Sequence, residues 1–124
     1  MSTDIALFVL RVVAGAVVLT HGWPKLSNFQ STLQWLMKEK FPLPLLSTLA
    51  LSITETFFAV FLILGILTKV AAVFIGLAML VATGYHIKKG DTFHHNTEVT
   101  LLLLAIMVTI LLAGGGSWQI AAWL

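Results

Sequence analysis

Four long apolar segments constrain this chain more than any other feature of its sequence. They cover approximately residues 5–20, 45–67, 70–87 and 97–113. Each is close to the roughly 17–25 residues that an α-helix needs to cross a bilayer. The segments lack the two-residue alternation of strands, and in lipid only helices or closed barrels satisfy the backbone. The sequence therefore predicts an all-α fold, an integral membrane four-helix bundle that occupies a single domain, residues 1–124.

The composition agrees with lipid as the solvent. Hydrophobic residues make up 59% of the 124-residue chain and charged residues 10%, whereas soluble domains average roughly half apolar and a quarter charged. The first segment has no basic start or small-residue cleavage site, and Arg11 interrupts it, so we expect a retained helix rather than a signal peptide. No cysteine is present, which excludes disulfides and thiolate metal sites. The few basic residues do not suggest a nucleic-acid partner.

A shorter amphipathic helix is predicted between the first and second spanning segments, over residues 28–40. Phe29, Leu33, Leu36 and Met37 recur there at spacings of three and four, with polar residues between them. This pattern is typical of a helix that lies in the membrane interface, with its apolar face toward the acyl chains.

The distribution of lysines predicts an orientation. Loops 21–44 and 88–96 lie on the same side of a four-span topology, and they hold five of the six lysines. The turn on the opposite side carries only Lys69. The positive-inside rule therefore places loops 21–44 and 88–96 in the cytoplasm and both termini outside.

Two ionisable residues, Arg11 and Glu55, lie inside apolar segments. Such residues normally face the interior of a bundle and pair with one another. Counted along helices with these predicted ends, their Cα levels differ by about 9 Å, which two long side chains can bridge. We predict a buried polar pair. Two interpretations stay open for it, a structural ion pair that fixes helix register and a ligand or proton-relay site.

The histidines all fall on the loop side. His21 follows the first segment, His86 ends the third, and His94 and His95 come just before the fourth. Glu98 lies in the first turn of the fourth helix, at contact spacing from the last two histidines if that helix extends back far enough.

Three interpretations of this loop side stay open. Polar residues are ordinary at a membrane interface, and an acidic residue suits a helix N-terminus. Alternatively, the histidines and Lys25 line a polar pocket for an oxygen-bearing head group such as a quinone. A metal or haem site with His21 and His86 as ligands is the third interpretation, although no defined metal-ligand spacing is present.

Six short motifs follow one another along almost the whole chain. They are Leu10-Arg11-Val12 with Gly15, His21-Gly22-x-x-Lys25-Leu26, Glu55, residues 64–72, residues 79–82, and the glycine-rich residues 114–118. In this order they resemble the DoxX family of small four-helix bacterial membrane proteins, which is related to the DoxD subunit of thiosulfate:quinone oxidoreductase. The resemblance departs at the C-terminal end, where Ser117 and Ala121 replace the usual basic and acidic residues.

The resemblance implies a bacterial inner-membrane protein linked to redox and quinone chemistry. Arg11, His21, Lys25 and Glu55 match family positions, so they become candidate substrate-binding residues, together with His86. The secondary candidates are His94, His95 and Glu98.

The resulting hypothesis is a redox-associated component that binds a quinone-like or other small lipophilic substrate in a polar pocket of the bundle. The sequence leaves both possibilities open, a protein that turns over this substrate and one that only binds it. If the protein is an enzyme, the resemblance implies a membrane subunit of a quinone-linked oxidoreductase. Quinone is the one candidate cofactor, and no residue is assigned as a metal ligand. The implied partners besides the bilayer are other membrane redox proteins or further copies of the chain. The alternatives are a non-catalytic scaffold or accessory subunit of a larger membrane complex, a small exporter, and a bis-histidine cytochrome.

Overall fold

The computed structural model describes residues 2–89, 97–117 and 119, without the side chains of His86 and Lys89. Over these residues the chain forms helices joined by short turns, and no strand is found in this described part. The elements are α1 (Ser2–Ser27), α2 (Phe29–Lys38), α3 (Pro44–Ile53), the π-helical segment η1 (Thr54–Phe58), α4 (Ala59–Leu64), α5 (Thr68–Lys89) and α6 (Glu98–Ala113).

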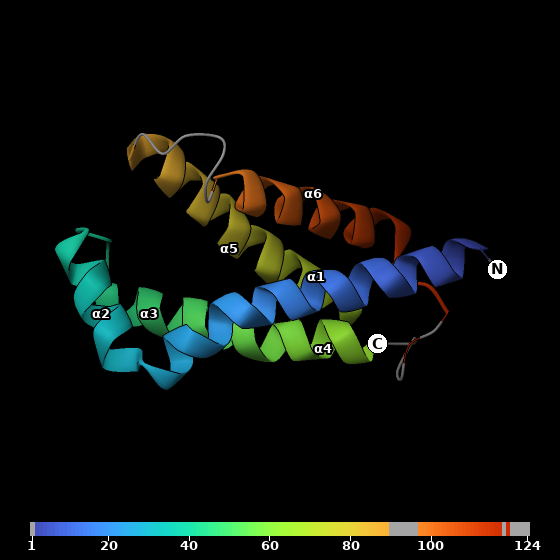
Figure 1. Ribbon diagram of the computed structural model, residues 1–124, viewed down its shortest axis with the longest axis horizontal. Coiled ribbons are helices and arrows are strands. Elements are labelled where there is room, and N and C mark those ends of the chain that lie inside the picture. The colour runs from blue at the N-terminus through green and yellow to red at the C-terminus, as the bar shows by residue number, and fades with distance from the viewer. Residues whose placement is uncertain (1, 90–96, 118, 120–124) are drawn as a thin grey trace.

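The spanning helices lie alongside one another, and α2 turns across one end of them (Figure 1). The segments α3, η1 and α4 join end to end into one rod, which packs against α1, and α5 packs closely against α6. Three helices are long and apolar enough to cross a membrane: Ser2–Ser27, Pro44–Leu64 and Thr68–Tyr85. The last helix, α6, is apolar but has only 16 residues. The molecule is therefore an all-helical membrane protein.

The predicted helices are all present, but their ends differ. The first helix was predicted to end near Thr20, at the sequence Gly22-Trp23-Pro24; instead α1 continues through Pro24 to Ser27. A proline this close to a helix end removes one backbone donor without stopping the chain from remaining helical, and the amide of Asn28 still bonds to the carbonyl of Pro24 at 2.9 Å. The first helix is therefore about two turns longer than predicted.

The second predicted helix, 45–67, ends earlier, at Leu64. Gly65 adopts a left-handed conformation with φ of 77°, and its amide and that of Ile66 both bond to the carbonyl of Phe61 at 2.9 Å. This Schellman-type ending suits glycine, which has no Cβ to oppose it. The remaining predictions, 28–40, 70–87 and 97–113, correspond to α2, α5 and α6.

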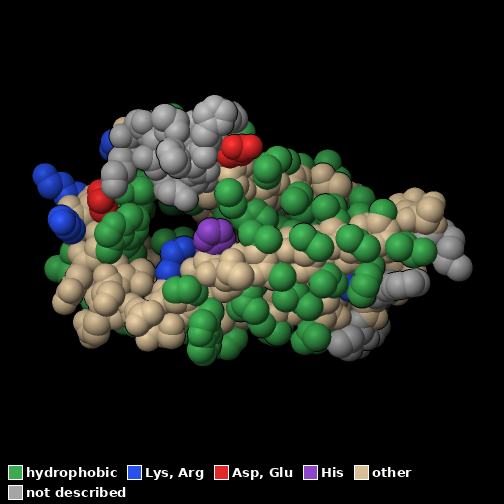
Figure 2. Space-filling view, viewed as in Figure 1, with side chains coloured by type: hydrophobic (Ala, Val, Ile, Leu, Met, Phe, Trp, Pro, Cys, Tyr) green, Lys and Arg blue, Asp and Glu red, His purple; other side chains and the backbone are tan. Residues whose placement is uncertain are grey.

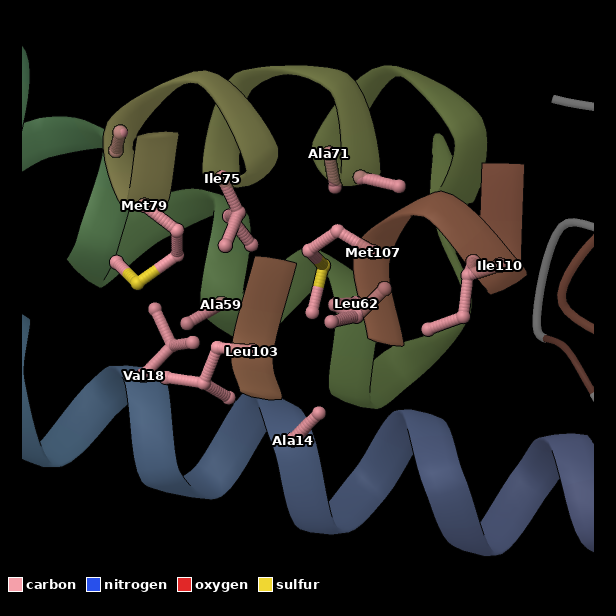
Figure 3. Packing of buried hydrophobic residues seen from close by; sticks show 12 residues of the cluster. Ala14, Val18, Ala59, Leu62, Ala71, Ile75, Met79, Leu103, Met107 and Ile110 are labelled. Atoms are coloured by element: carbon pink, nitrogen blue, oxygen red, sulfur yellow. The ribbon is translucent and has the colours of Figure 1, made fainter. Parts of the chain in front are cut away.

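The core of the bundle is apolar and is built from every spanning helix (Figure 3). Val18 of α1 and Leu62 of α4 lie in it with Ile75 of α5 and Met107 of α6, all almost fully buried. Large apolar side chains also cover the outside of the spanning helices, for example Leu112, which is 81% exposed. Such an exterior is unfavourable in water and matches a hydrocarbon environment.

Candidate functional site

Glu55 and Lys25 form an ion pair at the loop end of the bundle. Lys25 Nζ donates to Glu55 Oε2 at 2.5 Å. The glutamate side chain is 3% exposed, and the lysine side chain is 30% exposed. An intramembrane carboxylate is therefore neutralised by a lysine that still reaches the surface, as long basic side chains do when they snorkel to an interface.

Gly22 brings these two side chains together. A Cβ on Gly22 would lie 2.3 Å from the carbonyl carbon of Glu55 and 2.4 Å from its carbonyl oxygen. Only a glycine lets α1 approach η1 this closely. Lys25 follows Gly22 by three residues, which is about one helical turn, so it lies on the same face of α1. The longer α1 is what carries Lys25 to Glu55.

Glu55 lies in a π-helical turn with unusual polar surroundings. Single π-turns are rare and occur often at functional sites. Within the described residues, the hydroxyl oxygens of Ser52 and Thr56 are buried without a hydrogen-bond partner. Thr97, at the start of α6, has a third hydroxyl of this kind. A buried, unpaired hydroxyl is costly unless something else satisfies it.

A cavity of about 90 Å³ adjoins the ion pair. Four elements contribute to its wall, namely α1, η1, α5 and α6. Figure 2 shows a histidine and a Lys or Arg side chain adjacent on this side of the molecule, close to a hollow in the surface. The lining residues are His21, Lys25, Glu55, Met79, Ala82, Val99 and Thr100. The cavity combines an imidazole, an ammonium, a carboxylate and a hydroxyl, which together can donate or accept hydrogen bonds and exchange protons.

The predicted ion pair between Arg11 and Glu55 is wrong. Glu55 lies opposite Gly22, and Arg11 precedes Gly22 by 11 residues, which is about 16 Å along a helix. The predicted difference of about 9 Å assumed that the first helix stops near Thr20. Arg11 and Glu55 are both buried, as predicted, but they belong to opposite ends of the bundle.

Arg11 instead bonds to the backbone. Its Nε donates to the carbonyl of Leu62 at 2.7 Å and its Nη1 to the carbonyl of Gly115 at 2.7 Å. Leu62 lies in the last turn of α4, where carbonyls lack partners within the helix. The guanidinium carbon also lies 5.4 Å from the centre of the Phe8 ring. The cation therefore caps the end of α4 and holds the glycine-rich segment after α6 against the bundle.

The same end contains further contacts to that segment. The amide of Ser117 bonds to the Asp4 carboxylate at 3.1 Å, and Thr68 bonds to Gln119 through their side chains. Ser117 stands where the resemblance implies a basic residue. Its backbone amide, rather than its side chain, bonds to the start of α1.

The structure describes some of the other candidate residues but not all of them. His21 is exposed and lines the cavity. Glu98 lies in the first turn of α6 as predicted, and its side chain is exposed. The side chain of His86, and His94 and His95 entirely, lie outside the described residues. Within the part of the chain that the structure describes, no three His, Cys, Asp or Glu side chains form a metal cluster.

Two features of the site escaped sequence reasoning. The π-turn leaves no pattern in hydropathy. The close contact at Gly22 did have a signal, since a small residue in a membrane helix commonly marks a helix–helix contact, but the residue was interpreted as part of a helix stop.

Comparison with known proteins identifies the family of this chain. The family model described as DoxX matches residues 6–89, which include Arg11, Lys25 and Glu55, while α6 and the glycine-rich segment lie beyond the match. No curated protein and no solved structure matches the chain. Because the family match covers more than half of the sequence, this chain is a member of the DoxX family.

Proposed function

We propose that this DoxX protein is a bacterial inner-membrane component that binds a quinone-like or other small lipophilic molecule at the Lys25–Glu55 pair. In this proposal the chain is one domain and α6 is the fourth crossing helix of a bundle. Its 16 residues span about 24 Å, which is shorter than the hydrocarbon core of about 30 Å. The lysine-rich loops 21–44 and 88–96 face the cytoplasm.

The ion pair at the wall of the cavity carries this proposal. A purely structural ion pair in lipid should be closed, with every nearby polar group satisfied. Here the pair borders a cavity and Glu55 lies in a π-turn. Among the described residues, the hydroxyls of Ser52 and Thr56, close to Glu55 in the sequence, have no partner, although neither residue lines the cavity. A ligand with carbonyl or hydroxyl oxygens in this cavity can accept a hydrogen bond from Lys25.

The size of the cavity limits how the ligand binds. A drug-sized molecule needs roughly 300–1,000 Å³, and the cavity beside Glu55 has about 90 Å³. It accommodates one oxygen-bearing edge of a ring, and the rest of the ring and any isoprenoid tail remain among the surrounding helices and lipid. Lys25 donates to the ligand oxygen, and Glu55 and His21 hold or accept a proton beside it.

The test uses the full chain in lipid nanodiscs and a short-chain benzoquinone analogue. Trp23 lies two residues from His21 and is 59% exposed, so a bound quinone is expected to quench its fluorescence in a saturable way. Glu55→Gln and Lys25→Met are expected to weaken binding at least about tenfold, the effect of losing one charge-assisted hydrogen bond of about 1.5–3 kcal/mol.

Lys38→Met is the matched control, because Lys38 is an exposed lysine of α2 that does not line the cavity. Its affinity should equal that of the wild type. The proposal is overturned if quenching does not saturate, or if Glu55→Gln, Lys25→Met and Lys38→Met behave alike. A protein that binds no quinone analogue but copurifies in a fixed ratio with another membrane protein would instead support the scaffold or accessory-subunit alternative.

A further inference from the structure

A second and larger cavity lies beyond the Lys25–Glu55 site, and we propose that it binds the phosphate group of an anionic phospholipid. It is formed where α2 ends, by the turn that follows α2 and by the last turns of α5. Its volume is about 380 Å³, which is within the range of ligand pockets. The lining residues are Glu39, Lys40, Phe41, Pro42, Gly84, Tyr85 and Lys88.

The charges on this wall favour an anion. Lys40 and Lys88 both line the cavity and are exposed. Neither forms an ion pair with a residue in the described ranges, so both ammonium groups are available to a ligand. Glu39 is the one acidic residue of the described lining, so these described residues carry a net positive charge. Basic pockets at the ends of membrane helices are typical binding places for anionic lipid head groups.

The backbone holds Lys40 in a conformation that seldom suits a lysine. Helix α2 ends in a Schellman motif, in which the amide of Phe41 bonds to the carbonyl of Leu36 at 3.0 Å and that of Lys40 to Met37 at 3.1 Å. Lys40 occupies the left-handed position with φ of 60°. Glycine is the usual residue there, as at the end of α4, where Gly65 takes it with φ of 77°. Lys40 lines the cavity from this conformation, which Leu43 and Leu67 also adopt elsewhere in the chain.

Three aromatic rings fix the cavity at the depth of lipid head groups. Tyr85 of α5 lies 5.0 Å from Phe41 and 5.7 Å from Trp35 of α2, measured between ring centroids. This cluster ties α2 to the end of α5. Tyrosine and tryptophan concentrate at the membrane–water interface, where the phosphate groups of lipids also lie.

A lipid fits these features better than free phosphate. The apolar exterior of α5 leads from the cavity into the membrane, for example through Val81, which is 54% exposed. A phospholipid can therefore place its acyl chains along that surface while its phosphate reaches the two lysines. This binding is independent of a quinone at the Lys25–Glu55 pair.

The experiment measures thermal unfolding of the full chain in neutral detergent. Phosphatidylglycerol, phosphatidylcholine and inorganic phosphate are added separately. Phosphatidylglycerol is expected to raise Tm by about 5 °C or more, as a ligand well above its Kd does, and the other two should leave Tm almost unchanged. An equal rise with phosphatidylcholine overturns the requirement for an anion, and an equal rise with inorganic phosphate overturns the assignment to a lipid.

Lys40→Gly with Lys88→Gln is the decisive variant. Glycine at position 40 relieves the positive φ, so this variant should fold at least as well as the wild type and yet lose the response to phosphatidylglycerol. Lys38→Gln and Lys69→Gln are single-charge controls, because both residues are exposed lysines outside the cavity lining, and both should retain the response. If the decisive variant also retains it, or if the controls lose it equally, the proposed lipid site is wrong.

Discussion

The two ends of this bundle each bury one charge, and they do so in opposite ways. At one end the Arg11 side chain is held by backbone carbonyls of Leu62 and Gly115. At the other end Glu55 is held by a partly exposed lysine side chain, beside a cavity and two unpartnered hydroxyls in the described structure. The backbone around Arg11 cannot change partners without moving a helix end. The lysine beside Glu55 can move within its own rotamers.

The contrast between the Arg11 end and the Glu55 end shows that burial of a charge in a membrane helix does not by itself identify a functional site. Arg11 and Glu55 are similarly buried, at 1% and 3% exposure. What separates them is whether their partners are fixed and whether space remains beside them. By this criterion we assign Arg11 to a structural clamp and propose Glu55 as the residue that contacts a ligand.

The largest effect is expected from Arg11→Met. The substitution leaves two buried carbonyls without their donor, at about 1–3 kcal/mol each, so the free energy of unfolding should fall by about 4 kcal/mol. Unfolding in a denaturing-detergent titration measures this fall. Folded Arg11→Met protein should bind the benzoquinone analogue as the wild type does, and weaker binding without loss of stability would reverse the roles assigned to the two ends.

Gly22→Ala tests the close contact at the Glu55 end. Its new Cβ meets the backbone of Glu55, which cannot withdraw as a side chain could, so we expect a loss of about 3 kcal/mol. Gly84→Ala is the matched control, since no atom of the described residues lies within 4 Å of its added Cβ, and a helical alanine there should stabilise by about 0.5–1 kcal/mol. Equal effects in the same unfolding titration would show that α1 does not pack on η1 as described.

Lys25→Met and Glu55→Gln should differ although they break the same ion pair. Removal of the lysine leaves a buried carboxylate unpaired, and we expect a loss of about 3 kcal/mol. Removal of the carboxylate leaves a lysine that can reach the interface, and we expect a loss of about 1 kcal/mol or less. The double variant should be more stable than Lys25→Met alone. Equal losses would mean that the lysine is as confined as Arg11.

The smallest effect, and the only one of opposite sign at this site, is expected from Thr56→Val. It removes a buried hydroxyl that has no partner among the described residues, so stability should rise by up to about 1 kcal/mol. Thr83→Val is the control, because the Thr83 hydroxyl bonds to Met79 at 2.8 Å and Thr100 at 2.9 Å, and its loss should destabilise by about 1 kcal/mol. A destabilised Thr56→Val would show that its hydroxyl is satisfied in the folded protein.

Hydropathy was sufficient to predict the helices, because lipid demands long apolar segments whatever their detailed packing. It was also sufficient to predict that Arg11 and Glu55 are buried. The partners of these residues depended on helix ends, which hydropathy locates poorly. Pro24 was weighed as a stop signal, whereas packing of α1 against the second rod keeps the helix intact to Ser27.

The ion pair of Lys25 could not be predicted from the sequence for the same reason, the misplaced end of the first helix. With the helix ended at Thr20, Lys25 belonged to a loop and had no defined direction. Once α1 continues, the spacing between Gly22 and Lys25 determines which face the lysine occupies. The π-turn at Glu55 depends on three-dimensional packing between helices, and no local sequence pattern predicts it.

The contact between Arg11 and Gly115 joins residues 104 positions apart. During synthesis α1 is made before α6. Arg11 therefore cannot bond to Gly115 until α6 and the segment after it have been made. Of the two backbone partners of Arg11, only the carbonyl of Leu62 is present before α6 is made. A chain halted after α5 is therefore expected to keep the bond from Arg11 to Leu62 but to lack the bond to Gly115 that anchors the segment after α6.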